Sequence, residues 1–355
     1  MEAYINSMCA ISPQNTFKGE KLPHDIREYD GVRYIKCIEP QYNEFIEPMA
    51  SRRMSRIIKM GVSSALKCLR DAGIENPDAI VTGTGLGCIE DTEKFLSSIY
   101  SNEEKLLNPT PFIQSTHNTV AAAIAIILKC NNYNNNYSHR GLSFENALQD
   151  SLMLLKEGSA NNVLVGGLDE LTTNSFFITD RLGFWKKDLI SNLHLLNYNS
   201  TGSLAGEGAA FFVLNSRQSD RNIAKLISAD TFYKPEGFPE TEMKLSSFIK
   251  KGVEDFSKID LILMGMNGDR LTDKVYYHLR NTIFRNIPCA FFKHLCGEYD
   301  TSVSFALYLA SSILKEQNVP SVVRLDNKPV KEIRNILIYN HMRNISHSAI
   351  MLSSC

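Results

Sequence analysis

One short segment of the chain brings together side chains that can transfer protons or attack electrophiles. Lys293, His294, Cys296 and Glu298 lie within six positions, and a helix rich in small residues is predicted after them, over Ser302–Leu314. Two interpretations are open for the charged pair: a structural ion pair that holds the loop, or a glutamate that acts as a general base. His294 and Cys296 likewise fit either a reactive couple or plain packing in a turn.

The elements that must position this loop follow a pattern of alternating helices and strands. Apolar residues recur at helical spacing in two stretches, and each stretch ends at a glycine before a short apolar run typical of a buried strand. This alternation predicts an α/β core with a parallel sheet. The first half contains, in order, a helix over Ser51–Ala72, a strand over Ala79–Thr82, a glycine turn over Gly83–Gly87, a helix from Ser143 that ends at Gly158, and a strand over Val163–Gly167.

The second half repeats the pattern of the first. A glycine turn at Gly206–Gly208 leads into a strand that ends at Leu214, after which strands and helices alternate again. We therefore predict two halves, 1–215 and 216–355, that pack as one body. The asparagine-rich run Asn131–Asn136 is interpreted as a loop. The second half contains predicted strands at Ala224–Ala229, Leu261–Met264 and Ile336–Tyr339, and predicted helices near Glu242–Gly252, Asp273–Arg280 and Ser302–Leu314.

Composition excludes several classes of function. Lysine and arginine total 38 and aspartate and glutamate 39, so a net charge of -1 gives no electrostatic basis for binding nucleic acid or an anionic membrane. No apolar run is long enough to span a membrane, and the first residues lack the layout of a signal peptide, which predicts a cytoplasmic protein. The eight cysteines form no C-x-x-C pair, so we expect neither a metal site nor a disulfide framework, and no cofactor.

Four motifs in order carry a resemblance to a known family. They are Gly83–Gly87, Gly166–Gly167, Gly206–Ala209 and the lysine-to-glycine spacing Lys293–Gly297, all on a duplicated α/β background. In this order the chain resembles the β-ketoacyl-[acyl-carrier-protein] synthases over nearly its whole length. The resemblance implies the thiolase-like fold, with two similar halves in α/β/α/β/α layers, and usually a dimer whose contact region matches 108–128.

The resemblance also implies a cysteine nucleophile at a helix start and two histidines that stabilise an enolate and an oxyanion. A thiolate gains from the positive end of a helix, and neutral imidazoles donate to developing negative charge. In this sequence the cysteine position falls on Ser143, or on Gly141 when the count runs back from Gly158. A serine nucleophile and a helix N-cap are both open for Ser143; we favour the cap, because its only nearby base is the loop residue His139.

The two histidine positions are also changed. Asn267 before Gly268 takes the place of the first histidine, and Glu298 takes the place of the second, whereas the family's lysine is kept as Lys293. A carboxylate repels an enolate or oxyanion, so the ion pair between Lys293 and Glu298 is the favoured interpretation. The family's Asn-Ser-Phe-Gly-Phe-Gly-Gly loop, which gates the acyl pocket, aligns with Asn340–Ser346 and keeps only its asparagine.

These losses indicate a chain that no longer condenses alone. It is similar to the chain-length-factor members of the family, which pair with an active synthase and shape the pocket for a growing chain. The implied partners are an acyl carrier protein or acyl thioester and a second ketosynthase-like chain, as a homodimer or as a heterodimer with an active ketosynthase, in a fatty-acid, polyketide or aryl-polyene type of biosynthesis. The alternative is an active 3-oxoacyl synthase or acyltransferase that uses Ser143 or Cys296.

Overall fold

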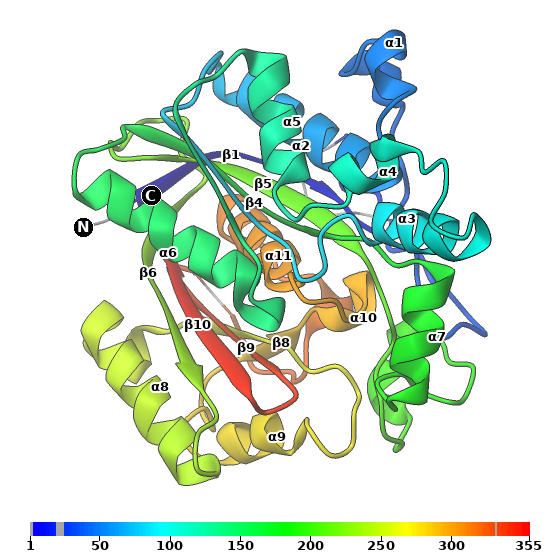
Figure 1. Ribbon diagram of the computed structural model, residues 1–355. Coiled ribbons are helices and arrows are strands. Elements are labelled where there is room, and N and C mark those ends of the chain that lie inside the picture. Colours follow the sequence, from blue (N-terminus) through cyan, green and yellow to red (C-terminus); the bar gives the residue numbers. More distant parts are fainter. Residues whose placement is uncertain (1–2, 19–24, 331) are drawn as a thin grey trace.

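The computed structural model describes residues 3–18, 25–330 and 332–355 (Figure 1). Its strands form one ten-stranded sheet in the order β3-β2-β4-β5-β1-β6-β10-β9-β7-β8. In chain order they are Ala3–Ile11 (β1), Ala79–Gly83 (β2), Tyr133–Tyr137 (β3), Asn162–Asp169 (β4), Gly208–Asn215 (β5), Ala224–Tyr233 (β6), Leu261–Met264 (β7), Cys289–Phe291 (β8), Asn335–Met342 (β9) and Ser346–Ser353 (β10).

The two halves of the sheet have the same connectivity. From its outer edge the first half is ordered β3-β2-β4-β5-β1, and the second is ordered β8-β7-β9-β10-β6, which is the same order when β6 is counted as the first strand. In each half the three outer strands are parallel and the two inner ones antiparallel. The halves join where β1 pairs with β6. The predicted junction near Asn215 falls at the end of β5, and the division into 1–215 and 216–355 stays a prediction.

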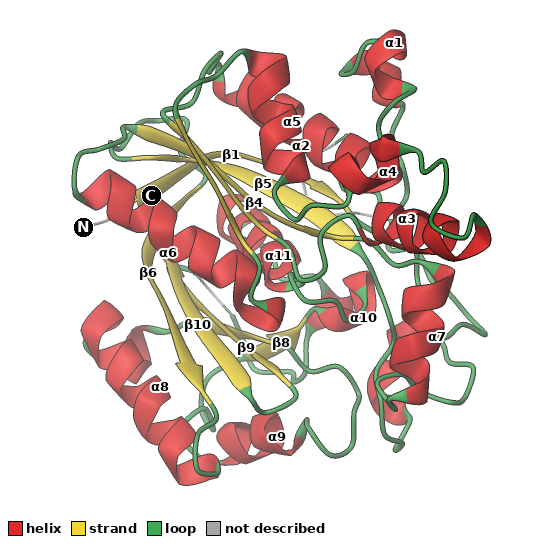
Figure 2. Cartoon of the chain, in the orientation of Figure 1, coloured by secondary structure: helices red, strands yellow, loops and turns green. Residues whose placement is uncertain are grey.

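Helices form three layers around the two sheet halves (Figure 2). α2 and α5 cover the outer face of the first half, α8 and α9 cover the outer face of the second, and α6 and α11 lie between them. The predicted α/β/α/β/α layering is therefore confirmed. The helices span Pro48–Ser51 (α1), Arg56–Ala72 (α2), Ile89–Ser101 (α3), Pro109–Gln114 (α4), Thr119–Leu128 (α5), Ser143–Lys156 (α6), Thr173–Arg181 (α7), Phe238–Val253 (α8), Lys274–Asn281 (α9), Lys293–Cys296 (α10) and Val303–Glu316 (α11).

α6 and α11 form the central layer, and the side chains that they bury there are mostly apolar. α11 is buried at every position from Val303 to Leu314, and Phe144 at the start of α6 is fully buried against the aromatic ring of Phe212 on β5. A large apolar side chain that leaves water in this way contributes roughly 1.5–3 kcal/mol. The starts of these two helices lie close together, since Arg140 before α6 is 3.5 Å from Asp300 before α11.

The asparagine-rich run is a strand, so the prediction of a loop there is wrong. Tyr133–Tyr137 forms β3, which pairs in parallel with β2 and forms one edge of the sheet. Asparagine disfavours strands, but β-propensity is weak beside tertiary pairing, and an edge strand exposes one side to water. The helix predicted from Ser51 begins later, at Arg56, because α1 and a turn precede it. Within the described ranges, no helix is long and apolar enough to cross a membrane.

Candidate functional site

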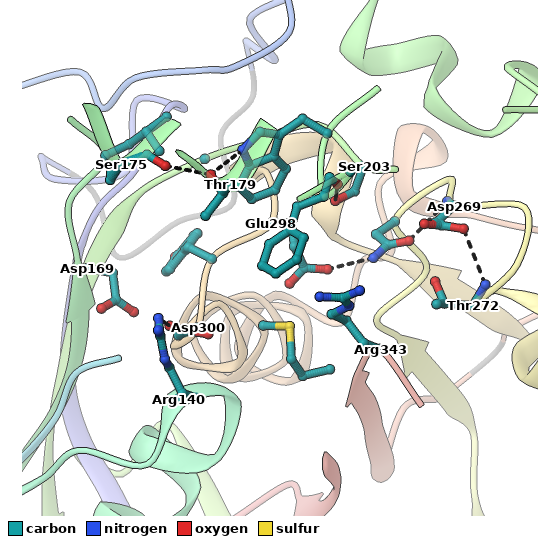
Figure 3. A pocket seen from close by; sticks show the side chains of 18 of the residues that line it. Arg140, Asp169, Ser175, Thr179, Ser203, Asp269, Thr272, Glu298, Asp300 and Arg343 are labelled. Carbon is teal, nitrogen blue, oxygen red and sulfur yellow. Dashed lines mark hydrogen bonds and ion pairs between the residues drawn. The ribbon is translucent and has the colours of Figure 1, made fainter. Parts of the chain in front are cut away.

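A cavity of about 240 Å³ opens where loops of both halves meet (Figure 3). Its walls come from the turn after β2, the turn before α6, the end of β4, α7, the segment 183–206, the loop after β7, the loop after α10 and the β9–β10 hairpin. The polar lining residues include Arg140, Asp169, Glu170, Asn267, Asp269, Glu298, Asp300 and Arg343, and the apolar ones include Leu86, Leu171, Phe184, Trp185, Leu271 and Met342. No cysteine and no histidine is among the described residues that line it.

Three of the predicted site residues meet beside this cavity: Asn267 and Glu298 line it, and Lys293 contacts Glu298 from within the protein. Lys293 Nζ lies 2.6 Å from Glu298 Oε2, and Asn267 Nδ2 donates a 2.7 Å hydrogen bond to the same oxygen. Lys293 and Glu298 are 1 % and 5 % exposed. The predicted ion pair between Lys293 and Glu298 is confirmed. Within low-dielectric surroundings two such charges persist only as a pair.

Two glycines let the Glu298 loop approach the start of β5. A Cβ on Gly206 would lie 2.1 Å from the carbonyl oxygen of Cys296, and a Cβ on Gly297, whose φ is +75°, would lie 2.5 Å from Gly206 Cα. Glu298 N–H donates to the Leu204 carbonyl at 2.8 Å, and Gly206 N–H donates to the Glu298 carbonyl at 3.1 Å. The glycine motifs therefore fix the backbone of Glu298, independent of any chemistry at its side chain.

The loop that carries Asn267 is held by a buried carboxylate and a buried lysine. Asp273 accepts the N–H groups of Asn267 and Gly268 at 3.2 and 2.8 Å, and burial raises the pKa of Asp273 to about 7. Lys186 Nζ donates a 2.7 Å bond to the Gly268 carbonyl and further bonds to Ser200, while burial lowers the pKa of Lys186. Asn267 is thus presented to Glu298 by a rigid support.

Ser143 is not presented to the cavity. It is fully buried, its hydroxyl donates to the Arg140 carbonyl at 2.7 Å, and it accepts the His139 N–H at 2.8 Å. Ser143 is the first residue of α6 rather than its N-cap, so its hydroxyl satisfies the preceding turn and not the free N–H groups of the helix start. The His139 side chain is exposed, as expected of a loop residue.

The alternative position, Gly141, is filled from the other half. A Cβ on Gly141 would lie 2.6 Å from Met342 Cβ, so the β9–β10 hairpin occupies the space in which a larger side chain would sit. The side chain that this turn does present to the cavity is Arg140, whose φ is +51°. The sequence analysis missed Arg140 because none of the motifs that it used includes this position.

Cys296 and His294 are packing residues. Both are fully buried, and the Cys296 thiol donates to the Gly297 carbonyl at 3.2 Å. Burial raises the pKa of the Cys296 thiol well above its usual value, which opposes formation of a thiolate. His294 stacks on Phe291 with ring centroids 3.9 Å apart, and burial lowers its pKa to about 3.

Four carboxylates in the cavity wall, Asp169, Glu170, Asp269 and Asp300, were missed by the sequence analysis. Asp169, at the end of β4, accepts bonds from Thr84, Gly85 and Thr301 at 2.8 to 3.0 Å. Asp300 lies 3.5 Å from Arg140, and its pKa rises to about 7 through burial and then through repulsion from Asp169. The position of Asp169 at the carboxyl end of a parallel strand was a usable signal, since ligands gather at that edge.

The hairpin that replaces the gating loop places a cation at the cavity. Three residues, 343–345, join β9 to β10, and Arg343 and Asn344 both have a φ of +56°, a left-handed value that tight hairpin turns use. The guanidinium of Arg343 lies 4.1 Å from the ring centroid of Phe184, and Met342 and Arg343 both line the cavity (Figure 3). Where the family has a phenylalanine and a glycine, this chain therefore has a packed methionine and a stacked arginine.

Comparison with known families matches the first half of the chain. Residues 35–178 match the model of the family described as beta-ketoacyl synthase, N-terminal domain. The predicted resemblance is thereby confirmed; the matched residues contain Gly83–Gly87 and Gly166–Gly167 and end before Gly206–Ala209 and Lys293–Gly297. No curated protein sequence is significantly similar to the chain.

Solved structures share the fold over the whole chain. A structure described as the ishigamide ketosynthase/chain length factor has a TM-score of 0.81 at 15% identity and covers 100% of this chain and 99% of that one. A beta-ketoacyl synthase from Burkholderia phymatum STM815 has a TM-score of 0.78 at 12% identity, with 100% and 99% coverage. A ketosynthase (ApeO) in complex with its chain length factor (ApeC) from Xenorhabdus doucetiae has 0.77 at 13%, with 99% and 98% coverage.

Proposed function

Since residues 35–178 carry a β-ketoacyl synthase N-terminal domain and the whole chain has the ketosynthase fold, we propose that it is a cytoplasmic, chain-length-factor-like partner subunit of a ketosynthase. Its role is to complete an active synthase and to shape the pocket in which a carrier-bound acyl chain grows. The partners are that synthase and an acyl carrier protein. The solved structures named above include such ketosynthase and chain length factor pairs.

The observation that carries the proposal is the state of the three catalytic positions. Condensation needs a thiolate and donors that stabilise an enolate and an oxyanion. In this chain the nucleophile turn supplies Gly141 and a buried Ser143, and the donor positions hold Asn267 and Glu298, joined to each other and to Lys293. A carboxylate at the oxyanion position destabilises the very charge that the reaction develops.

A free sheet edge and exposed apolar side chains support association with a second chain. Among the described strands β3 pairs with β2 alone, so its other edge offers unpaired backbone groups. Ile126 on α5, a helix that packs on β3, is 75 % exposed, and α4 exposes Phe112 and Ile113, which are 56 % and 64 % exposed. Exposed apolar side chains that gather beside a sheet edge mark an interaction surface.

The activity experiment uses the purified chain, an intact ketosynthase, labelled malonyl carrier protein and acyl carrier protein. We expect no condensation product from the chain alone, and product of altered length when the chain and the synthase are combined. The control is the same mixture with a synthase whose nucleophilic cysteine is replaced by alanine. Condensation by the chain alone, or in that control, would disprove the proposal and favour the alternative with a non-standard nucleophile.

A binding experiment tests the partner surface. Ile126→Asp places a charge on the exposed face of α5 and is expected to weaken the complex with the synthase by about 100-fold, because a buried unpaired charge is costly at an interface. The matched control is Met243→Asp on α8, which is 63 % exposed at the opposite outer layer. Equal effects of the two variants on the dissociation constant would remove α5 from the interface.

A further inference from the structure

The carboxylate of Glu298 has one oxygen in use and one without a partner. Oε2 accepts hydrogen bonds from both Lys293 and Asn267. Oε1 is buried and has no hydrogen-bond partner among the described residues. Glu298 is 5 % exposed and lines the cavity. We propose that Glu298 Oε1 recognises a hydroxyl group on the acyl chain of the ligand, so that the cavity selects hydroxyacyl groups over ketoacyl and saturated ones.

The chemistry of the free oxygen determines which group suits it. An ionised carboxylate accepts hydrogen bonds and cannot donate them. Glu298 Oε2 pairs with Lys293 at 2.6 Å and accepts a hydrogen bond from Asn267 at 2.7 Å, and these two contacts fix the orientation of the carboxylate. A hydroxyl donates to Oε1, whereas the oxygen of a ketone is itself an acceptor and repels it. A methylene leaves the oxygen unsatisfied, at the full desolvation penalty of a buried charged group.

Oε1 is buried in the free chain and has no partner within the described ranges, so a ligand hydroxyl gives it a hydrogen bond that it otherwise lacks, whereas a ketone or a methylene gives it none. Because Lys293 already neutralises Glu298, a neutral hydroxyl fits better than a cationic donor.

The walls of the cavity fit an acyl chain beside this polar point. Leu86, Leu171 and Met342 supply apolar surface, and Phe184 is held under the Arg343 guanidinium. The inference rests on the proposed function only in taking an acyl group as the occupant. The reaction that supplies such a ligand is the reduction of a ketone on the acyl chain to a hydroxyl.

Calorimetric titration of the full chain, without any synthase, tests the selection. The probes are pantetheine thioesters of 3-hydroxybutyrate, acetoacetate and butyrate, which share the same pantetheine donors and differ only in the acyl group. We expect the hydroxyacyl thioester to bind about 10- to 100-fold more tightly than the other two, the range of one hydrogen bond to a charged group. Equal binding of all three, tighter binding of the ketoacyl probe, or binding of none would overturn the proposal.

Glu298→Gln gives a sharper readout than loss of binding. The glutamine carbonyl is expected to keep the bonds from Lys293 and Asn267, which turns the NH₂ group toward the position of Oε1 and exchanges an acceptor for a donor. The preference should then shift toward acetoacetyl-pantetheine. The matched control is Glu145→Gln, a fully buried carboxylate on α6 that is not part of the cavity lining, and it should retain the wild-type ranking.

The outcomes separate this inference from the proposed partner function. A hydroxyacyl preference that survives in Glu298→Gln shows that another group selects the ligand and overturns the inference, whatever the chain does with a synthase. Hydroxyacyl selection that Glu298→Gln abolishes supports it even if no synthase complex forms. If the variant does not fold, as judged by its circular dichroism spectrum, the ranking of the three probes by the wild-type chain decides alone.

Discussion

The two halves of the molecule contribute unequally to the same cavity. The second-half loop Lys293–Glu298 keeps the lysine and glycine spacing of its family and holds a buried ion pair. The first-half turn Arg140–Ser143 keeps no family residue at the nucleophile position and is filled from outside by Met342. Backbone contacts explain why the second-half loop keeps its spacing. Gly297 lies against Gly206, and the Glu298 backbone is hydrogen-bonded to Leu204 and Gly206, just before β5. A loop whose backbone contacts support the fold can keep its glycine and lysine spacing even when its catalytic side chains have been replaced.

The largest expected effect comes from breaking the ion pair of the second-half loop. Glu298→Ala leaves Lys293 buried without a counter-charge, and we expect the free energy of unfolding to fall by about 3–5 kcal/mol. Chemical denaturation followed by circular dichroism measures this loss. The double variant Lys293→Met with Glu298→Leu removes both charges and should recover most of the stability, because two well-packed apolar side chains can replace a buried pair.

A loss below about 1 kcal/mol for Glu298→Ala would mean that Lys293 finds water or another acceptor, and the pair would then not be structural.

The same denaturation experiment on the first-half turn provides the comparison. Ser143→Ala removes two hydrogen bonds that Ser143 makes within the turn, and about 1–2 kcal/mol is expected. A larger effect at Ser143 than at Glu298 would reverse the ranking of the two regions.

Cysteine reactivity measures how differently the first-half turn presents its residues. Arg140→Cys, at a position whose side chain is 66 % exposed, should react with iodoacetamide at least about tenfold faster than Ser143→Cys, which is fully buried. The background is Cys355→Ser, since Cys355 is exposed in the wild type, and mass spectrometry locates the label. Fast labelling of Ser143→Cys would show that the turn opens, and would return Ser143 to the candidates for a nucleophile.

Features with a local sequence signal could be predicted, and features set by tertiary contacts could not. The alternation of helices and strands was predictable from local spacing, and the layered fold followed from the resemblance that the ordered motifs carry. The contact of Lys293 with Glu298 was predictable because the two opposite charges lie five positions apart in one loop. Strand β3 was not, because its pairing with β2 outweighs the low propensity of asparagine. Arg140 and Asp300 could not be paired from sequence, since they come from different halves and belong to no common motif.

Sequence spacing by itself does not identify which residue occupies the nucleophile position. Sequence spacing placed the nucleophile position at Ser143 and left Gly141 open as the alternative. The structure separates them by what surrounds each: Ser143 bonds within its own turn, and Gly141 lies against Met342. That second contact depends on the hairpin that replaces the gating loop, more than 200 residues away in the chain. A tertiary contact of this kind has no local signal.

The smallest expected effect concerns Asp300, which lies where the two regions meet. Its folded pKa of about 7 is raised above the unfolded value, so the folded state binds its proton more tightly. The stability that this proton contributes is present at low pH and is lost as pH rises through about 7. Glu145 and Asp273, with pKa values raised to about 7, and Glu170, raised to about 8, act in the same direction.

Asp300→Asn isolates the contribution of this one carboxyl group. Wild-type protein should lose stability between pH 5 and pH 8, and the variant should lose about 1–2 kcal/mol less over the same range, because its side chain has no proton to release. Urea denaturation at both pH values gives the difference.

Arg140→Gln tests the same carboxyl group from the other half of the molecule. It removes the cation 3.5 Å from Asp300 and should raise the Asp300 pKa further, which moves the loss of stability to higher pH. Parallel pH profiles for the wild type and Asp300→Asn would show that Asp300 is ionised throughout, and that the halves do not communicate through this pair.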